Sequence, residues 1–93
     1  MDLQIKHESA QHKFFAVVNG KEAFLEYSKV NDKTLDYHYT FVPPELRGQQ
    51  IAEKIVKFGL DYAEQQHYKI IPTCPYVKRI IERNPQYKKL VAE

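Results

Sequence analysis

The residues best suited to bind an anion lie where a predicted strand ends and a predicted helix begins, in the segment Arg47-Gly48-Gln49-Gln50-Ile51-Ala52. The first backbone N–H groups of a helix have no partner within it, and the helix dipole adds partial positive charge at that end. Arg47 adds a full positive charge. The segment therefore fits a phosphate or pyrophosphate group. The alternative is a plain strand-to-helix turn in which Gly48 serves only the backbone geometry.

Composition limits the other chemistry that the chain could carry. Its 93 residues include one cysteine, Cys74, which excludes a disulfide framework and a zinc site built on several thiolates. The four histidines are scattered without ligand spacing, so no metal site is predicted. A net charge of +2 is too small to indicate general nucleic-acid binding. Residues 43–93 hold nine Lys and Arg against six Asp and Glu, so an anion is expected to bind there.

The sequence predicts neither a membrane span nor an export signal. No apolar run approaches the roughly 18 residues that a membrane span needs. Residues 1–10 carry four charged or titratable side chains and lack the apolar core of a secretory signal. An unpaired cysteine fits a reducing compartment. Together these features predict a cytoplasmic protein that does not bind membranes.

The first half of the chain predicts an antiparallel meander. Residues 12–18 and 21–30 are rich in strand-forming residues and flank Asn19-Gly20, a pair that favours a two-residue hairpin turn because both positions need positive φ. Residues 34–42 predict a third strand, and residues 3–7 a short edge strand. On the third strand, one face is expected to carry Leu35, Tyr37, Tyr39 and Phe41.

The second half predicts helices and one more strand. The pair Pro43-Pro44 ends the third strand, since proline cannot donate a ladder hydrogen bond. Residues 49–66 show helical spacing around Gly59, which could let the helix pack closely on the sheet. A right-handed crossover should make the next strand parallel to the third, which gives a single α+β domain over residues 1–93. The remaining predicted elements are a strand over 68–72, a helix over 76–83 and a final helical turn over 85–91.

Two parts of this sequence resemble a known family. Residues 47–52 resemble the acetyl-CoA pyrophosphate loop of the GNAT acyltransferase superfamily, written Arg/Gln-x-x-Gly-x-Gly/Ala. The wider stretch 42–52, taken with residues 71–77 and 83–87, is similar to a branch of very small, single-domain GNAT-like N-acetyltransferases. The resemblance implies a minimal GNAT-like fold, in which an antiparallel β-meander is followed by a β-α-β unit and a C-terminal helix.

The resemblance also implies a function. It implies an acetyl-CoA-dependent N-acetyltransferase in which an amine acceptor attacks the thioester directly, and the alternative is a non-catalytic module that binds CoA or acyl-CoA. The pyrophosphate would lie on the amides of residues 48–52. The pantetheine arm would lie where the third strand and the strand near residue 70 splay apart. The implied cofactor contacts are Val42, Arg47, Gly48, Gln49, Gln50, Ile51, Ala52, Cys74, Arg79, Arg83 and Asn84.

Three residues of the second half are candidates for catalysis: Cys74, Tyr76 and Tyr87. Cys74 could line the thioester channel or act as an acyl-accepting nucleophile, and the alternative is a small buried residue. Tyr76 and Tyr87 could protonate the departing CoA thiolate, and the alternative for each is an aromatic ring packed on the sheet. Asn84 could contact the pantetheine amide or cap the last helix.

This chain departs from the family pattern at three positions, Gln50, Tyr39 and Phe41. Gln50 stands where the loop pattern has a glycine. The branch carries His-Thr-Glu-Val before the prolines, and this chain has Tyr39-Thr40-Phe41-Val42, so the histidine and the acidic residue are both absent there. His38 could replace the histidine only if the strand slipped by one residue, which would reverse the facing of every side chain.

A third interpretation is a single-stranded RNA-binding surface. It would use Tyr37, Tyr39 and Phe41 as stacking residues beside a basic cluster. Our main interpretation predicts no nucleic-acid partner. In it, Arg79 and Arg83 of that cluster could meet the 3′-phosphate of CoA, and the alternative is a solvated charged face. The cluster consists of Lys78, Arg79, Arg83, Lys88 and Lys89.

Overall fold

The turn at Asn19-Gly20 sets the register of the first hairpin. In the computed structural model, which describes residues 3–92, Asn19 and Gly20 adopt φ angles of 52° and 76°. They join β2 (Lys13–Val18) to β3 (Lys21–Asn31). The predicted hairpin is confirmed, because both turn positions take the left-handed conformation that a two-residue turn of this kind requires.

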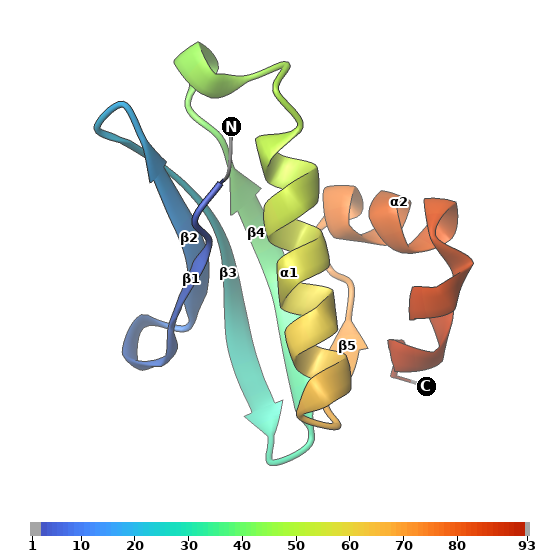
Figure 1. Cartoon of the computed structure of the whole chain (residues 1–93). Coiled ribbons are helices and arrows are strands. Elements are labelled where there is room, and N and C mark those ends of the chain that lie inside the picture. The colour runs from blue at the N-terminus through green and yellow to red at the C-terminus, as the bar shows by residue number, and fades with distance from the viewer. Residues whose placement is uncertain (1–2, 93) are drawn as a thin grey trace.

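The strands form one sheet in the order β1-β2-β3-β4-β5, and Figure 1 shows α1 lying across one of its faces. Strands β1 to β4 are antiparallel neighbours, whereas β5 pairs with β4 in parallel, as expected for a crossover through a helix. The predicted α+β architecture is confirmed. The other elements are β1 (Lys6–Glu8), β4 (Thr34–Phe41), β5 (Lys69–Ile71), α1 (Ile51–Gln65), α2 (Pro75–Arg83) and the 3₁₀ segments η1 (Ser9–Gln11), η2 (Pro44–Leu46) and η3 (Pro85–Leu90).

A β-bulge in β4 reverses the facing of its second half. Glu26 pairs with Tyr39 while the next residue of β3 pairs with Tyr37, so His38 is an extra residue in β4. Tyr37 is fully buried under α1, but Tyr39 lies on the opposite face with 46% of its surface exposed. The prediction that Tyr39 and Phe41 share a face with Tyr37 is therefore wrong. The physical reason is that a one-residue insertion shifts the two-residue alternation of a strand.

Gly59 allows α1 to approach the sheet closely. A Cβ atom at this position would lie 3.1 Å from Cδ2 of Leu25, 3.2 Å from Cε2 of Tyr37 and 3.3 Å from Cδ2 of Phe14. These three side chains are fully buried and belong to the core between α1 and the sheet. The predicted close packing at Gly59 is confirmed.

Strands β4 and β5 separate after three residue pairs. β5 pairs only with Thr34, Leu35 and Asp36, although β4 continues to Phe41. The chain after β5 crosses this opening once, where the backbone N–H of Cys74 donates a 3.0 Å hydrogen bond to the carbonyl oxygen of Tyr37. The expected splay between the two strands is thus present, and α2 begins at its edge.

Two smaller expectations differ in detail from the structure. The predicted edge strand over residues 3–7 is found at Lys6–Glu8, where His7 Nε2 lies 2.6 Å from the hydroxyl of Tyr27. The last helical turn is a 3₁₀ segment, η3. None of the helices described in residues 3–92 is long and apolar enough to cross a membrane. The same part of the chain contains no cluster of three or more His, Cys, Asp or Glu side chains arranged to hold a metal ion.

Candidate functional site

A pocket lies where the loop after β4 meets the first turns of α1 and α2. It has a volume of about 290 Å³. It unites the segment that the sequence singled out with Tyr76, which comes from the beginning of α2. Its lining residues are Val42, Leu46, Arg47, Gly48, Gln50, Ile51, Ala52 and Tyr76.

The backbone amides at this end of α1 are available for a ligand. The first backbone hydrogen bond into the helix runs from Lys54 N to Gln50 O over 3.1 Å, and the N-cap residue Gln50 makes no capping hydrogen bond through its side chain. The N–H groups of residues 51–53 therefore lack helical partners. Together with the helix dipole, they favour an anion in the pocket.

Two residues of this loop adopt left-handed backbone conformations. Gly48 has φ of 83°, and Gln50 has φ of 62° with ψ of 22°. Glycine adopts this conformation without a steric penalty, whereas for an L-residue with a side chain the conformation costs about 1 kcal/mol or more. The conformation explains why the family pattern places glycine at the position of Gln50, and it shows that the loop keeps its shape with glutamine there.

Arg47 stands at the mouth of the pocket. Its Nε donates a 3.1 Å hydrogen bond to the carbonyl oxygen of Val42, the last residue before the proline pair. This bond fixes the guanidinium beside the end of β4, while the side chain as a whole stays exposed. The structure brings Val42, Arg47 and the α1 amides together, as the sequence predicted.

The side chain of Tyr76 lines the pocket from the opposite side. Burial raises the pKa of its hydroxyl, and the nearby Glu53 carboxylate raises it further. The charges of Arg83 and Arg79 act in the opposite direction and lower it. Tyr76, Arg79 and Arg83 follow helical spacing and lie on one face of α2. The two arginines thus share the α2 face of Tyr76 without lining the pocket, and their contact with a phosphate stays a prediction.

Cys74 is buried rather than open to the pocket. Only 7% of its surface is exposed, and its Sγ lies 3.5 Å from Oγ1 of Thr40. Among residues 3–92, no carboxylate or imidazole forms a hydrogen bond with Sγ, so the geometry offers no base for a nucleophilic thiol. Cys74 lies at the opening between β4 and β5, so its role in lining the thioester channel stays a prediction.

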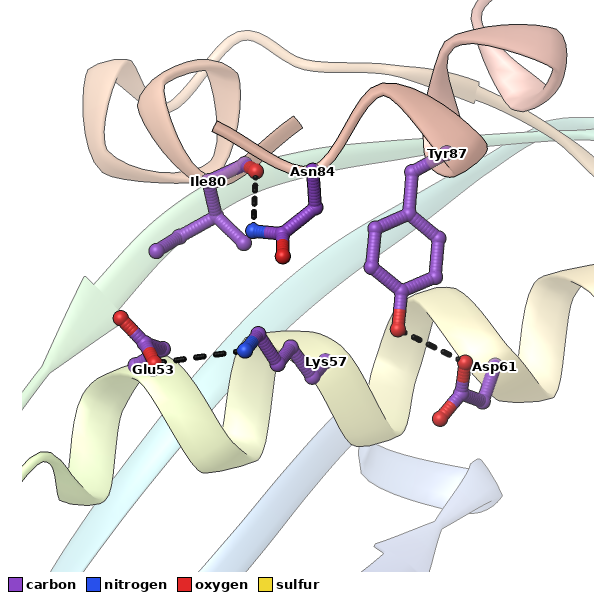
Figure 2. A network of polar contacts seen from close by, with 6 residues as sticks. All are labelled: Glu53, Lys57, Asp61, Ile80, Asn84 and Tyr87. Atoms are coloured by element: carbon purple, nitrogen blue, oxygen red, sulfur yellow. Dashed lines mark hydrogen bonds and ion pairs between the residues drawn. The ribbon is translucent and has the colours of Figure 1, made fainter. Parts of the chain in front are cut away.

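The structure does not bring Tyr87 to the pocket. Its hydroxyl donates a 2.9 Å hydrogen bond to Oδ1 of Asp61, as Figure 2 shows, and the ring is almost fully buried. Asp61 lies about 15 Å along α1 from its first residue. Burial and the Asp61 carboxylate raise the pKa of Tyr87 to about 12. The proposed acid role of Tyr87 is corrected to a structural one, which fastens η3 to α1.

Asn84 acts on the helix before it. Its Nδ2 donates a 2.8 Å hydrogen bond to the carbonyl oxygen of Ile80 (Figure 2), and its side chain makes no capping bond to η3. The expectation that Asn84 caps the last helix is therefore wrong. Its side chain instead donates to a carbonyl oxygen at the C-terminal end of α2, the helix before it. With its amide engaged there, Asn84 does not line the pocket.

A larger hollow of about 530 Å³ lies on the other side of the same helix end. It shares Gln49 and Ile51 with the loop, but neither Arg47 nor Tyr76 lines it. Of the two spaces, the smaller one has the uncapped amides, a guanidinium and an ionisable hydroxyl on its walls. We therefore assign the candidate site to the smaller pocket.

Comparison with known proteins agrees with this geometry. The sequence profile of the family described as GCN5-related N-acetyl-transferase matches residues 13–90. The chain belongs to the GCN5-related N-acetyltransferase family. The family resemblance seen in the loop and in the segments after β5 is thereby confirmed.

Relatives and a solved structure extend the match over most of the chain. Protein NATD1 of Danio rerio is 32% identical over 85 residues, which are 89% of this chain and 77% of the fish protein. Protein NATD1 of Homo sapiens is 29% identical over 85 residues, 89% of this chain and 75% of its own. An NMR solution structure of a "GCN5-like putative N-acetyltransferase" from Staphylococcus aureus superposes with a TM-score of 0.75 at 27% identity, covering 97% of this chain and 88% of that one. The predicted minimal GNAT-like fold is confirmed.

The sequence did not predict two further residues at or beside the site. Leu46 forms part of the pocket wall from η2, and Glu53 lies close enough to Tyr76 to raise the pKa of its hydroxyl. Glu53 also forms a 3.3 Å ion pair with Lys57 one turn later (Figure 2). The i,i+4 spacing of that pair was visible in the sequence, but its place opposite α2 was not.

Proposed function

We propose that this member of the GCN5-related N-acetyltransferase family binds acetyl-CoA in the pocket at the α1 N-terminus and transfers the acetyl group to an amine. The observation that carries the proposal is the convergence of three features on one pocket: uncapped helix amides, the Arg47 guanidinium and the Tyr76 hydroxyl. The pocket opens beside the unpaired part of β4, where an extended ligand can lie against strand backbone.

The residues of the pocket fit the diphosphate of CoA. A pyrophosphate needs several N–H donors and a positive field, and residues 51–53 together with Arg47 supply both. At Gly48 nothing within 4 Å would meet a Cβ atom, so the backbone there is open to a ligand. Arg79 and Arg83 supply further cations beside Tyr76 for the 3′-phosphate.

When bound, acetyl-CoA supplies an acetyl group activated as a thioester, which an amine can attack while the carbon–sulfur bond breaks. Tyr76 is the group of this chain that can protonate the departing sulfur. Its hydroxyl holds its proton at neutral pH, because burial raises its pKa above the ordinary value. Among the described residues, no carboxylate or imidazole lines the pocket, so the attacking nitrogen passes its proton to water.

A specific observation favours a second candidate, a module that binds CoA without turnover. Phe41 occupies the position where the branch carries an acidic residue, and the bulge turns its ring to the face away from α1. A site that relies on water as its base would bind the cofactor through the same residues and yet transfer the acetyl group slowly or not at all.

Calorimetry and NMR with CoA and acetyl-CoA test the binding step. We expect heat on mixing and shifts of the amide resonances of residues 48–53. Arg47→Gln and Arg83→Gln should weaken binding, whereas Lys29→Gln, a matched loss of charge on the exposed end of β3, should not. Absence of both heat and shifts would reject both candidate functions.

Release of CoA thiol separates the two candidates. The protein is incubated with acetyl-CoA and a panel of amines, and a sample without acetyl-CoA corrects for the thiol of Cys74. Thiol release that depends on an amine supports the transferase. Binding without release from any amine assigns the chain to the second candidate.

A further inference from the structure

The face of the sheet opposite α1 carries a cluster of aromatic rings from three adjacent strands. Register places Phe15 of β2 beside Phe24 of β3, and Phe24 beside Phe41 of β4. The ring of Phe24 lies 5.8 Å from that of Tyr39 and 5.6 Å from that of Phe41. We call Phe15, Phe24, Tyr39 and Phe41 the aromatic face.

This face already holds one ammonium group of the chain itself. The Nζ of Lys13 lies 5.3 Å from the ring centre of Phe15 and 5.8 Å from that of Phe24. The same Nζ donates a 3.0 Å hydrogen bond to Oε1 of Glu22 on β3. Aromatic rings that face the cation and a carboxylate next to it are two features that favour binding of an ammonium ion.

The same two features recur on the other side of Phe24, where Glu26 lies between its cross-strand neighbours Lys13 of β2 and Tyr39 of β4. Tyr39 is 46% exposed, and Glu26 pairs with it across the β3–β4 ladder. Within residues 3–92, Glu26 has no ion pair, in contrast to Glu22. Lys13 gives its ammonium to Glu22, so the carboxylate of Glu26 beside Tyr39 has no ion-pair partner among the described residues.

The charge of the surrounding face favours a cationic partner. Strand alternation and register put three lysines and four carboxylates on it. Glu22 engages one of these lysines, and another, Lys69, donates its Nζ hydrogen bond to the carbonyl oxygen of Lys89. The excess is acidic, although the chain as a whole carries a net charge of +2. These charged residues are Lys6, Lys13, Lys69, Glu8, Glu22, Glu26 and Asp36.

We infer that the aromatic face docks a lysine-bearing polypeptide segment, with the lysine ammonium between Tyr39 and Glu26. The inference rests on the proposed function in one respect: the docked segment would present the acceptor amine. β4 connects the two sites, because Phe41 is followed directly by Val42 of the pocket and Thr40 between the rings contacts Cys74 at the strand opening. A polypeptide suits this open sheet surface, whereas small ligands favour concave pockets.

The test is an NMR titration of the whole protein with a short peptide that contains one lysine flanked by glycine and serine. Its matched partner is the same peptide with the lysine acetylated, which lacks the charge. We expect the lysine peptide to shift the ring resonances of Phe24, Tyr39 and Phe41, and the acetylated peptide to bind about 5-fold more weakly. Equal shifts with both peptides, or no shifts at the aromatic face, would overturn the inference.

Two variants link the binding to the named residues. Glu26→Gln keeps the shape of the side chain and should weaken the lysine peptide about 5-fold, as should Tyr39→Ala. Val30→Ala, which truncates an exposed apolar side chain near the far end of β3, should leave the affinity unchanged. Unchanged affinity in Glu26→Gln would contradict the inference even if Tyr39→Ala were to disturb the sheet.

Further measurements exclude other occupants and separate this inference from the proposed function. Sedimentation of the free protein is expected to give a monomer, and a dimer lost in Tyr39→Ala would assign the face to a second copy instead. Tighter binding of a single-stranded RNA oligonucleotide than of the peptide would likewise overturn the inference. CoA binding is measured on the same samples. If the protein binds CoA but not the lysine peptide, the docking surface alone is rejected. If it binds the peptide but not CoA, the transferase alone is rejected.

Discussion

The hydroxyl of Tyr37 donates a 2.6 Å hydrogen bond to the carbonyl oxygen of Gly59, which fastens β4 to α1 where the glycine lets the helix pack closely on the sheet. Tyr37 immediately precedes the bulge residue His38, and its carbonyl oxygen accepts the bond from Cys74 that limits the strand opening. One buried residue thus fixes the helix, the bulge and the edge of the candidate site relative to one another.

Replacing Gly59 with alanine should destabilise the protein. Helix propensity alone would favour alanine by about 1 kcal/mol, but the added methyl group would lie 3.1 to 3.3 Å from three core side chains. Overpacking of this kind costs about 1–3 kcal/mol, so we expect a net loss of about 1 kcal/mol in the free energy of unfolding. Urea denaturation measures it, and a variant more stable than the wild type would contradict the close packing.

Replacing Gln50 with glycine should stabilise the loop and raise its affinity for CoA. The left-handed conformation of Gln50 costs about 1 kcal/mol, and glycine removes that cost at some loss of chain entropy. We expect a gain of about 0.5 kcal/mol in unfolding free energy and tighter CoA binding by calorimetry. Gln49→Gly is the matched control, because Gln49 has no positive φ and should lose stability. Equal effects of the two substitutions would contradict the interpretation of the loop.

Replacing Tyr76 with phenylalanine should slow acetyl transfer and leave CoA affinity nearly unchanged. The substitution keeps the ring on the pocket wall and removes the hydroxyl that can protonate the departing sulfur. Loss of a general acid lowers kcat by about 100-fold or more. Steady-state kinetics with the best amine of the panel measures kcat and KM separately. A kcat equal to that of the wild type would remove Tyr76 from the mechanism.

Replacing Tyr87 with phenylalanine should change stability and leave transfer unaffected. The lost hydrogen bond to Asp61 costs about 1 kcal/mol at neutral pH. The pKa of Tyr87 is raised from 10.0 to about 12 in the folded protein, so the folded state holds this proton more tightly. Its contribution is complete below pH 10 and is lost as the pH rises toward 12. The stability difference between wild type and variant should therefore shrink over that range, and a pH-independent difference would contradict the assignment.

Local signals in the sequence determined the order of the elements, the first hairpin and the position of the anion-binding loop. Asn19-Gly20 has a preferred turn conformation of its own, the proline pair ends β4 whatever lies beside it, and a helix exposes its first amides in any fold. Only the tertiary structure decided which side chains meet. The bulge at His38 arises from the register between β3 and β4, and it turns Tyr39 and Phe41 away from the helix. Tyr76 reaches the pocket, Tyr87 reaches Asp61 and Asn84 turns back to Ile80 because of how α2 and η3 pack on the rest of the chain, and contacts between distant residues leave no periodic signal in the sequence.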